Sequence, residues 1–339
     1  MDTRKLTTQI AKIALPLILG GAILYWMYRD FDFGQVKHAM LHEMDWTWML
    51  LSMPFGITAQ LFRGLRWRQT LSPIGEEARL STAVNAIFLS YASSLVIPRV
   101  GEFARCGVLR RYDGVSFSKA LGTVVTERAV DTLVVMVITL FTLLYQLPTF
   151  HNFFATTGTR LDTFLGQFTT TGYIVTFICL TAALILIWVL LRTMSVYNKV
   201  KTTLGNLWQG VISLRDVRNI PLYIFLTLGI WGSYFLHYYL TFFCFEGTSH
   251  LGLNCALVSF VVGSIAVIVP TPNGAGPWHF SVKTMLILYG VASTTALSFV
   301  LIVHTLQTLL VVLLGIYAMV ALGQTRPRPA HDHLSPTDQ

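Results

Sequence analysis

The segment Ser90–Arg105, SYASSLVIPRVGEFAR, combines a membrane-like apolar run with a chain break and a charged stretch. The run is interrupted at Pro98, and Arg99, Glu102 and Arg105 then follow at three-residue spacing. If the part after Pro98 is helical, these three side chains share one face. Charged groups beside a broken apolar helix are costly in a bilayer and usually serve a function.

A second segment, Ser264–His279, SIAVIVPTPNGAGPWH, repeats this plan far downstream. Small and apolar residues again lead to prolines, then to glycines, and then to a polar side chain. Two interrupted segments in corresponding halves of a hydrophobic chain indicate a site near the middle of the membrane in a transporter-like protein.

The composition of the whole chain agrees with a membrane protein. Hydrophobic residues make up 54% of the 339 residues, charged residues only 12%, and the mean hydropathy is +0.61. Soluble domains carry about 25% charged residues. The net charge of +8 is better explained by membrane topology than by nucleic acid, because no basic soluble domain is present. The four cysteines form no CxxC pair, so we expect no disulfide framework, no metal site and no cofactor.

We predict an all-α polytopic membrane protein with about six full spans. The first apolar run resembles a signal peptide, but no small-x-small cleavage site follows it, and Tyr25, Trp26 and Tyr28 form an interfacial aromatic end. We therefore interpret it as a retained span with a cytoplasmic N-terminus. The expected spans cover approximately residues 13–28, 46–61, 121–147, 173–191, 221–245 and 294–322.

Two further apolar pieces are predicted to be re-entrant hairpins. The apolar part of 83–97 is shorter than the roughly 20 residues that a span needs, and arginines both precede and follow it. It should therefore enter and leave on the cytoplasmic side. Residues 251–269 and 278–289 should form a hairpin from the outside, since this keeps Arg326 and Arg328 cytoplasmic. Hairpins of opposite direction are typical of an inverted repeat.

The connecting segments follow from this topology. Arg63, Arg66, Arg68 and Arg79 mark a cytoplasmic loop, and the apolar residues of 200–214 recur at helical spacing, which predicts a surface helix. Outside loops are expected at 29–45, 148–171 and 246–250. We assign residues 1–324 to one transmembrane domain in the cell inner membrane, and residues 325–339 to a disordered cytoplasmic tail.

At three charged or glycine-rich motifs the chain resembles the flippase-like, lysylphosphatidylglycerol-synthase transmembrane family, over roughly residues 46–323. The first motif is carried by Pro98, Arg99, Gly101, Glu102 and Arg105, and the second by Val125, Glu127, Arg128 and Asp131. The third is carried by Pro270, Pro272, Gly274 and Gly276, with Asn273 in place of a glycine and His279 where a glutamate is usual.

The resemblance implies movement of lipids, such as aminoacylated phospholipids or polyprenyl-linked intermediates, between leaflets. Two-domain members of this family carry a separate soluble domain for aminoacyl transfer. This chain has no room for that domain, so we expect no synthase activity.

The charged motifs suit phosphate binding, with structural alternatives. Arg99 and Arg105 would hold a lipid phosphate bidentately while Glu102 fixes their geometry; the alternative is a basic loop with a surface ion pair. Glu127 and Asp131 share a helix face, with Arg128 rotated by about 100°. In one arrangement, the two acids pair with Arg99 and Arg105 across the hairpin. In the alternative, these charges form a purely structural salt-bridge cluster.

The glycine-rich motif offers a second anion-binding geometry. Gly274 and Gly276 allow close backbone approach, and Pro277 would begin a half-helix whose N-terminal N–H groups favour an anion. The alternative is a tight extracellular turn. His279 lies one turn into that half-helix, either as a packing residue or as a proton carrier.

We therefore expect a lipid translocase rather than an enzyme, with a phospholipid or polyprenyl phosphate as its partner. The first alternative is an accessory subunit of a cell-envelope glycosyltransferase or lipid-modifying enzyme. The expected protein partner is then a membrane enzyme or a second copy of this chain in a homo-oligomer. The second is a membrane transferase that uses Glu102. The predicted substrate-binding residues are Arg99, Glu102, Arg105, Glu127, Arg128, Asp131, Asn273, Gly274, Gly276 and His279.

Overall fold

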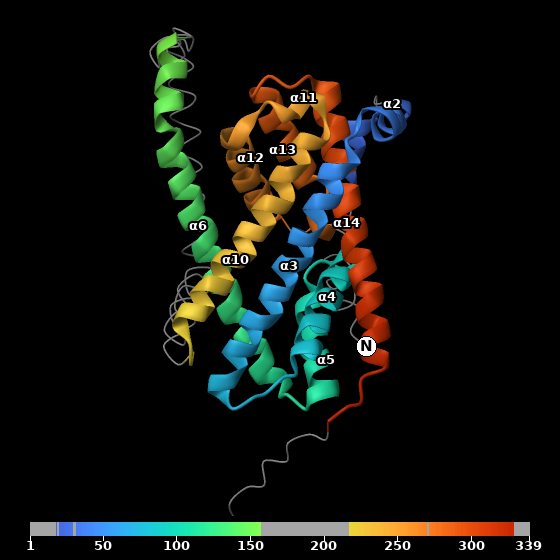
Figure 1. Ribbon diagram of the computed structural model, residues 1–339, viewed down its shortest axis with the longest axis vertical. Coiled ribbons are helices and arrows are strands. Elements are labelled where there is room, and N and C mark those ends of the chain that lie inside the picture. The colour runs from blue at the N-terminus through green and yellow to red at the C-terminus, as the bar shows by residue number, and fades with distance from the viewer. Residues whose placement is uncertain (1–17, 19, 30–31, 157–216, 270, 329–339) are drawn as a thin grey trace, which may run out of the picture. The chain divides into compact units, whose positions relative to one another are not determined.

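The computed structural model describes residues 18, 20–29, 32–156, 217–269 and 271–328, which are helical apart from short connections and contain no strand (Figure 1). The chain divides into two units, residues 1–128 with 214–339, and residues 129–213. The boundary falls inside helix α6 (Phe117–Thr156). The predicted span at 173–191, the surface helix at 200–214, residues 13–17 and 19 of the first span, and most of the tail lie outside the described residues. Residues 20–28 of the first span are helical.

Three helices in the described part of the chain are long and apolar enough to cross a membrane. They are Phe117–Gln146 within α6, Ile220–Cys244, and Ser293–Gly323, which is α14. Ile220–Cys244 combines α10 (Ile220–Tyr239) with the 3-10 helix η4 (Leu240–Cys244). Asn219 caps α10 by accepting a hydrogen bond from the N–H of Leu222, and Pro221 occupies the first turn, where a missing N–H costs nothing.

The segments between the predicted spans are also partly helical. Residues expected as an outside loop form α2 (Phe33–His38) and the π-helix η1 (Ala39–Glu43). The turn after α10 contains the short helix α11 (Glu246–Ser249). The predicted loop at 148–171 is wrong for its first part, because α6 continues through Pro148 to Thr156. In an apolar setting a helix tends to continue past a proline, since ending it leaves backbone groups unpaired.

Helix α3 (Trp46–Leu71) corrects a second prediction. It begins at Trp46, as expected, with the Asp45 carboxylate accepting from the N–H of Thr47. It does not end near Leu61, however, and runs on for further turns before the 3-10 helix η2 (Ser72–Ile74). Arg63 and Arg66 therefore lie inside a helix and are buried, rather than in a cytoplasmic loop. Helix α10 packs along α3.

The first broken segment forms a helical hairpin, here called hairpin 1, of α4 (Leu80–Val96) and α5 (Val100–Asp113). The two helices pack against each other, and the chain reverses at Ile97–Arg99. The predicted break at Pro98 is confirmed. At the open end of hairpin 1, Arg79 binds the Asp113 carboxylate and the carbonyl of Tyr112.

The second broken segment forms hairpin 2, which consists of α12 (Gly252–Ala266), the 3-10 turn η5 (Pro272–Gly274) and α13 (Pro277–Leu288). Helix α13 begins at Pro277, as predicted. Helix α14 then runs past both hairpins. It packs against α4, where Gly315 lies directly on Ala92, and also against α13.

The hairpins approach each other from opposite ends of the first unit (Figure 1). Hairpin 1 shares a hydrophobic core with Leu71 at the end of α3 and with Leu322 at the end of α14. Hairpin 2 shares a separate core with Met49 at the start of α3 and with Phe299 near the start of α14. Helices α3 and α14 each extend from one core to the other. The closed ends of the two hairpins meet in the region between these cores.

The first residues of the predicted tail are attached to the fold. The N–H of Arg328 donates to the carbonyl of Tyr112 at 2.8 Å, and Arg79 donates to the carbonyl of Arg326 at 3.1 Å. These bonds hold the chain after α14 against the end of α5.

Candidate functional site

The turn of hairpin 1 depends on two unusual backbone positions. Arg99 adopts a left-handed conformation with φ 65° and ψ −4°, which is uncommon for a residue with a side chain. Gly101 follows it and lies against the carbonyl of Ser90, so that a Cβ at this position would collide with the backbone of α4. The close contact of α4 and α5 therefore requires glycine here.

Arg99 does not share a face with Glu102 and Arg105, contrary to the prediction. Its left-handed backbone places it before the helix, exposed, whereas Arg105 is only 2% exposed. The guanidinium of Arg99 instead donates to the carbonyl of Ile268, at the closed end of hairpin 2, at 3.3 Å. Arg99 therefore links the two broken segments directly.

Arg105 and Glu127 form a buried ion pair. Nη1 of Arg105 lies 2.7 Å from Oε2 of Glu127, and Arg66 approaches the other carboxylate oxygen at 3.9 Å. The side chains of Arg66 and Glu127 are fully buried. One of the predicted pairs across the hairpin is thus present. Arg66 was missed, although the lack of a stop signal after the apolar run of α3 could have indicated a continuing helix.

Aromatic side chains surround these charges. The guanidinium of Arg105 lies over the ring of Trp67 at 4.5 Å, and the Trp67 indole N–H donates to Thr123 at 2.9 Å. Such contacts hold a desolvated cation in place without neutralising it. Trp67 therefore orients Arg105, while the charge of Arg105 is paired with Glu127.

Arg63 lies one turn before Arg66 on α3 and is also buried. Its guanidinium lies about 6 Å from the rings of Tyr91 on α4 and Tyr234 on α10, whose hydroxyls are 2.8 Å apart. Arg63, Arg66 and Arg105, together with Glu127, are here called the arginine cluster.

Arg105 keeps hydrogen-bond donors that the cluster does not satisfy. Its Nη1 faces Glu127, but its Nε and Nη2 are buried without a hydrogen-bond partner among the described residues. Buried donors without partners are unfavourable, so an anion that accepts from Arg105 would stabilise this part of the cluster. Asp131, which is also buried, belongs to the second unit of the chain.

Arg128 and Glu102 form a separate, more exposed pair. The Nε of Arg128 lies 3.5 Å from Oε1 of Glu102, with side chains 43% and 34% exposed. Glu102 therefore contacts α6 rather than bracing Arg99 and Arg105, as had been predicted. A pair of this exposure contributes only about 0–1 kcal/mol.

Hairpin 2 is fastened to α14 by a closed ring of hydrogen bonds. The side-chain amide of Asn273 donates to Thr308 at 2.8 Å, and Nε2 of His304 lies 3.1 Å from the carbonyl of Asn273. Since Nε2 must donate to that carbonyl, Nδ1 of His304 accepts from the Thr308 hydroxyl at 3.4 Å. Asn273 is therefore occupied in holding the hairpin, with a left-handed backbone at φ 50°.

His279 caps its own helix. It is 2% exposed, and its Nδ1 accepts from the N–H of Gly276 at 3.4 Å. This takes one of the N–H groups predicted to face an anion. The ring of His279 lies 4.4 Å from that of His304, beside a cavity of about 590 Å³. Gly274 and Gly276 have φ of 71° and 93°, which explains their residue type.

No group of three or more His, Cys, Asp or Glu side chains that could hold a metal ion occurs in the part of the chain that the structure describes.

The comparison with known protein families is decisive for the class. The sequence model described as "Lysylphosphatidylglycerol synthase TM region" matches residues 13–315. The chain belongs to this family. No curated protein and no solved structure matches it significantly.

Membership of this family has two consequences. Together with the apolar helices, it identifies a multi-pass membrane protein with a lipid-related function. The match also spans both hairpins, the arginine cluster and the ring at Asn273, so the site described above lies within the family's own region.

A first prediction concerns the ring of hydrogen bonds at hairpin 2. Thr308→Val should lower the free energy of unfolding by about 1–3 kcal/mol, because the amide of Asn273 and Nδ1 of His304 lose their partner. Thr305→Val, at an exposed position of α14 outside the ring, is the matched control and should change stability by less than about 0.5 kcal/mol. Unfolding of purified protein in mixed micelles measures both; equal effects would contradict the ring.

Proposed function

We propose that this protein is a lipid translocase, not an enzyme, which moves an anionic lipid between the leaflets of the cell inner membrane. The lipid is an aminoacylated phospholipid or a polyprenyl-phosphate-linked intermediate. The two hairpins would be re-entrant from opposite faces, as halves of an inverted repeat. Hairpin 1 would open to the cytoplasm, where both termini would also lie.

The observation that carries the proposal is the pair of unsatisfied donors on the buried side chain of Arg105. Among the described residues, Nε and Nη2 of Arg105 are buried without a hydrogen-bond partner. Unsatisfied donors of a buried cation are unfavourable, and a phosphate would accept these bonds. A lipid is the phosphate carrier that a membrane protein meets inside the bilayer.

The arrangement of the hairpins supports movement between leaflets. A hydrogen bond from Arg99 to the carbonyl of Ile268 joins the closed ends, which also pack against each other through α4 and η5. A single exposed hydrogen bond contributes only about 0.5–1.5 kcal/mol, so this contact can open and close. Its opening would let a headgroup pass from Arg105 on one hairpin to the other, while the lipid chains stay in the bilayer.

The distribution of basic residues supports the orientation. At the open end of hairpin 1 lie Arg79, Arg110, Arg111 and Lys119, and the chain after α14 adds Arg326 and Arg328 at the same end. Lysine and arginine concentrate on the cytoplasmic side of membrane proteins. This end would therefore be cytoplasmic.

The test measures the rate of lipid translocation in vesicles that contain the Arg105→Lys variant. Lysine keeps the positive charge but lacks the planar guanidinium that binds phosphate bidentately. We expect the translocation rate to fall about tenfold, the effect of losing one good charge-assisted hydrogen bond. The control is Arg110→Lys, at an exposed position of the same helix, which should leave the rate unchanged.

The assay follows labelled phosphatidylglycerol and a labelled polyprenyl phosphate in parallel. Labelled phosphatidylcholine, whose headgroup has no net charge, is the comparison. Thermal unfolding of each variant confirms that it is folded. A wild-type protein that moves neither anionic lipid, with or without a pH gradient, would overturn the proposal. So would a folded Arg105→Lys variant with the full rate.

A further inference from the structure

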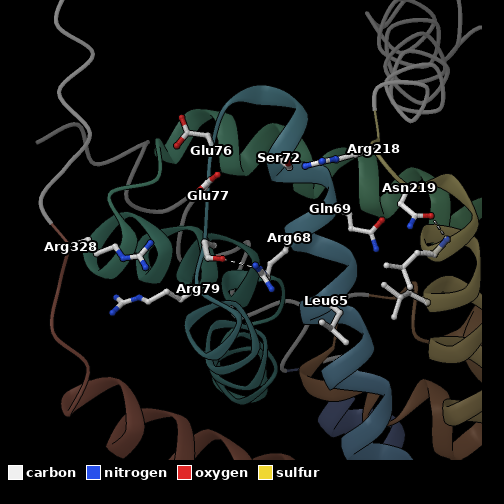
Figure 2. A pocket seen from close by; sticks show the side chains of 13 residues that line it. Leu65, Arg68, Gln69, Ser72, Glu76, Glu77, Arg79, Arg218, Asn219 and Arg328 are labelled. Atoms are coloured by element: carbon white, nitrogen blue, oxygen red, sulfur yellow. Dashed lines mark hydrogen bonds between the residues drawn. The ribbon is translucent and has the colours of Figure 1, made fainter.

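A cavity of about 720 Å³ lies at the basic end of the first unit (Figure 2). It is formed by the last turns of α3, the loop that follows them, the start of α10, and Arg328 after α14. Its lining contains none of the four residues of the arginine cluster. The cavity is therefore separate from the proposed translocation site.

The rim of this cavity is strongly basic (Figure 2). It contains four arginines and two glutamates: Arg68, Arg79, Arg218, Arg328, Glu76 and Glu77. Arg79 is paired with Asp113, and Glu76 with Lys119 at 2.9 Å. The remaining three arginines stand against Glu77 alone, which leaves a surplus of two positive charges.

The floor of the cavity is apolar. Leu222 and Leu226 lie one turn apart on α10 and face the cavity together with Leu65 of α3. A basic rim above an apolar floor matches an amphipathic anion. A free phosphate or nucleotide would use the arginines but would leave the leucines exposed to water.

We propose that this cavity is a second anionic-lipid site, distinct from the translocation site. It binds the phosphate of a membrane phospholipid at Arg68 and Arg218, with the first carbons of one acyl chain against Leu65, Leu222 and Leu226. Arg68 lines the cavity and is already oriented, because its Nε donates to the carbonyl of Ala78 at 2.9 Å. The inference goes beyond translocation and does not depend on it.

A bound lipid would connect three parts of the chain. Arg68 and Leu65 belong to α3, Arg218 and Leu222 to the start of α10, and Arg328 to the chain after α14. A phosphate between these arginines relieves their mutual repulsion. A bound anionic lipid would therefore strengthen the packing at this end of the unit.

Photo-crosslinking of the full-length protein in detergent tests this site. The probe is phosphatidylglycerol with a diazirine near the carbonyl of one acyl chain, and labelled peptides are mapped by mass spectrometry. We expect labelling of the peptides that contain Leu65 and Leu222. Arg68→Gln with Arg218→Gln should reduce that labelling about tenfold, by removing two charge-assisted contacts.

The matched control is Arg110→Gln with Arg111→Gln, which removes the same charge from exposed positions of α5 outside the cavity. It should leave labelling unchanged. Arg218→Gln alone, which keeps the hydrogen bond from Arg68 to Ala78, keeps the test valid if the double variant fails to fold.

Three outcomes would overturn the inference. The first is equal labelling of these peptides by a phosphatidylcholine probe, which would mean that the anionic charge is not recognised. The second is complete competition by inorganic phosphate at the concentration of the lipid, which would indicate a free-phosphate site. The third is a control variant that loses labelling as strongly as Arg218→Gln. Loss of labelling with intact lipid translocation would support this site and leave the proposed function standing.

Discussion

Glu127→Gln is expected to lower the free energy of unfolding by about 3–5 kcal/mol, because it leaves buried guanidiniums without their counter-charge. Glutamine has nearly the shape of glutamate, so packing is preserved and the loss reports the charge. Glu127 lies 2.7 Å from Arg105 and 3.9 Å from Arg66, and all three side chains are buried. Denaturant unfolding in mixed micelles measures the effect.

Glu102→Gln is the control for this substitution. It also removes a carboxylate that pairs with an arginine, but both partners are partly exposed. Its cost should stay below about 1 kcal/mol, since solvent screens the pair. Equal losses for the two variants would show that burial does not set the energy of the cluster.

A double variant separates charge from packing. Glu127→Gln combined with Arg105→Gln restores the original charge balance, so it should be less destabilised than the sum of the two single variants by about 1–3 kcal/mol. Additive losses would mean that Arg105 and Glu127 do not interact, contrary to the geometry.

Gly101→Ala is the second change with a large expected effect. The added methyl group would meet the backbone carbonyl of Ser90 and the hydroxyl of Ser94, so α5 must move away from α4. Overpacking against backbone costs about 1–3 kcal/mol or more, because backbone cannot rotate aside. We expect a loss of about 3 kcal/mol and a shift of the whole turn that positions Arg99.

Gly107→Ala on the same helix is the control. A Cβ there meets nothing within 4 Å, and alanine is about 0.5–1 kcal/mol better than glycine inside a helix. This variant should be slightly more stable than the wild type. If Gly101→Ala is also neutral or stabilising, α4 and α5 do not pack as closely as the structure shows.

Local signals in the sequence predicted the helix breaks and the class of the protein well. Pro98 and Pro277 mark a break and a helix start because proline fixes its own backbone, whatever surrounds it. Prediction from local sequence signals failed where the apolar surroundings let a helix continue. Arg63 and Arg66 look like loop residues by charge, yet α3 carries them into the interior.

The candidate site was predicted only in part. Arg105 and Glu127 were both identified as members of charged motifs, and they do form a pair. Their third partner, Arg66, lies in no such motif. Arg99 was assigned to the same face as Arg105, but its left-handed backbone directs it toward Ile268 instead. No spacing rule for a regular helix anticipates such a residue.

The sequence by itself determined that this chain is an apolar, helical membrane protein with two broken segments, because composition and proline act locally. Only the tertiary structure decided that the broken segments meet, that Arg66 and Arg105 both lie beside Glu127, and that hairpin 2 is fastened through Asn273. These features join residues far apart in the chain. Their energies depend on burial and distance, which exist only once the helices have packed.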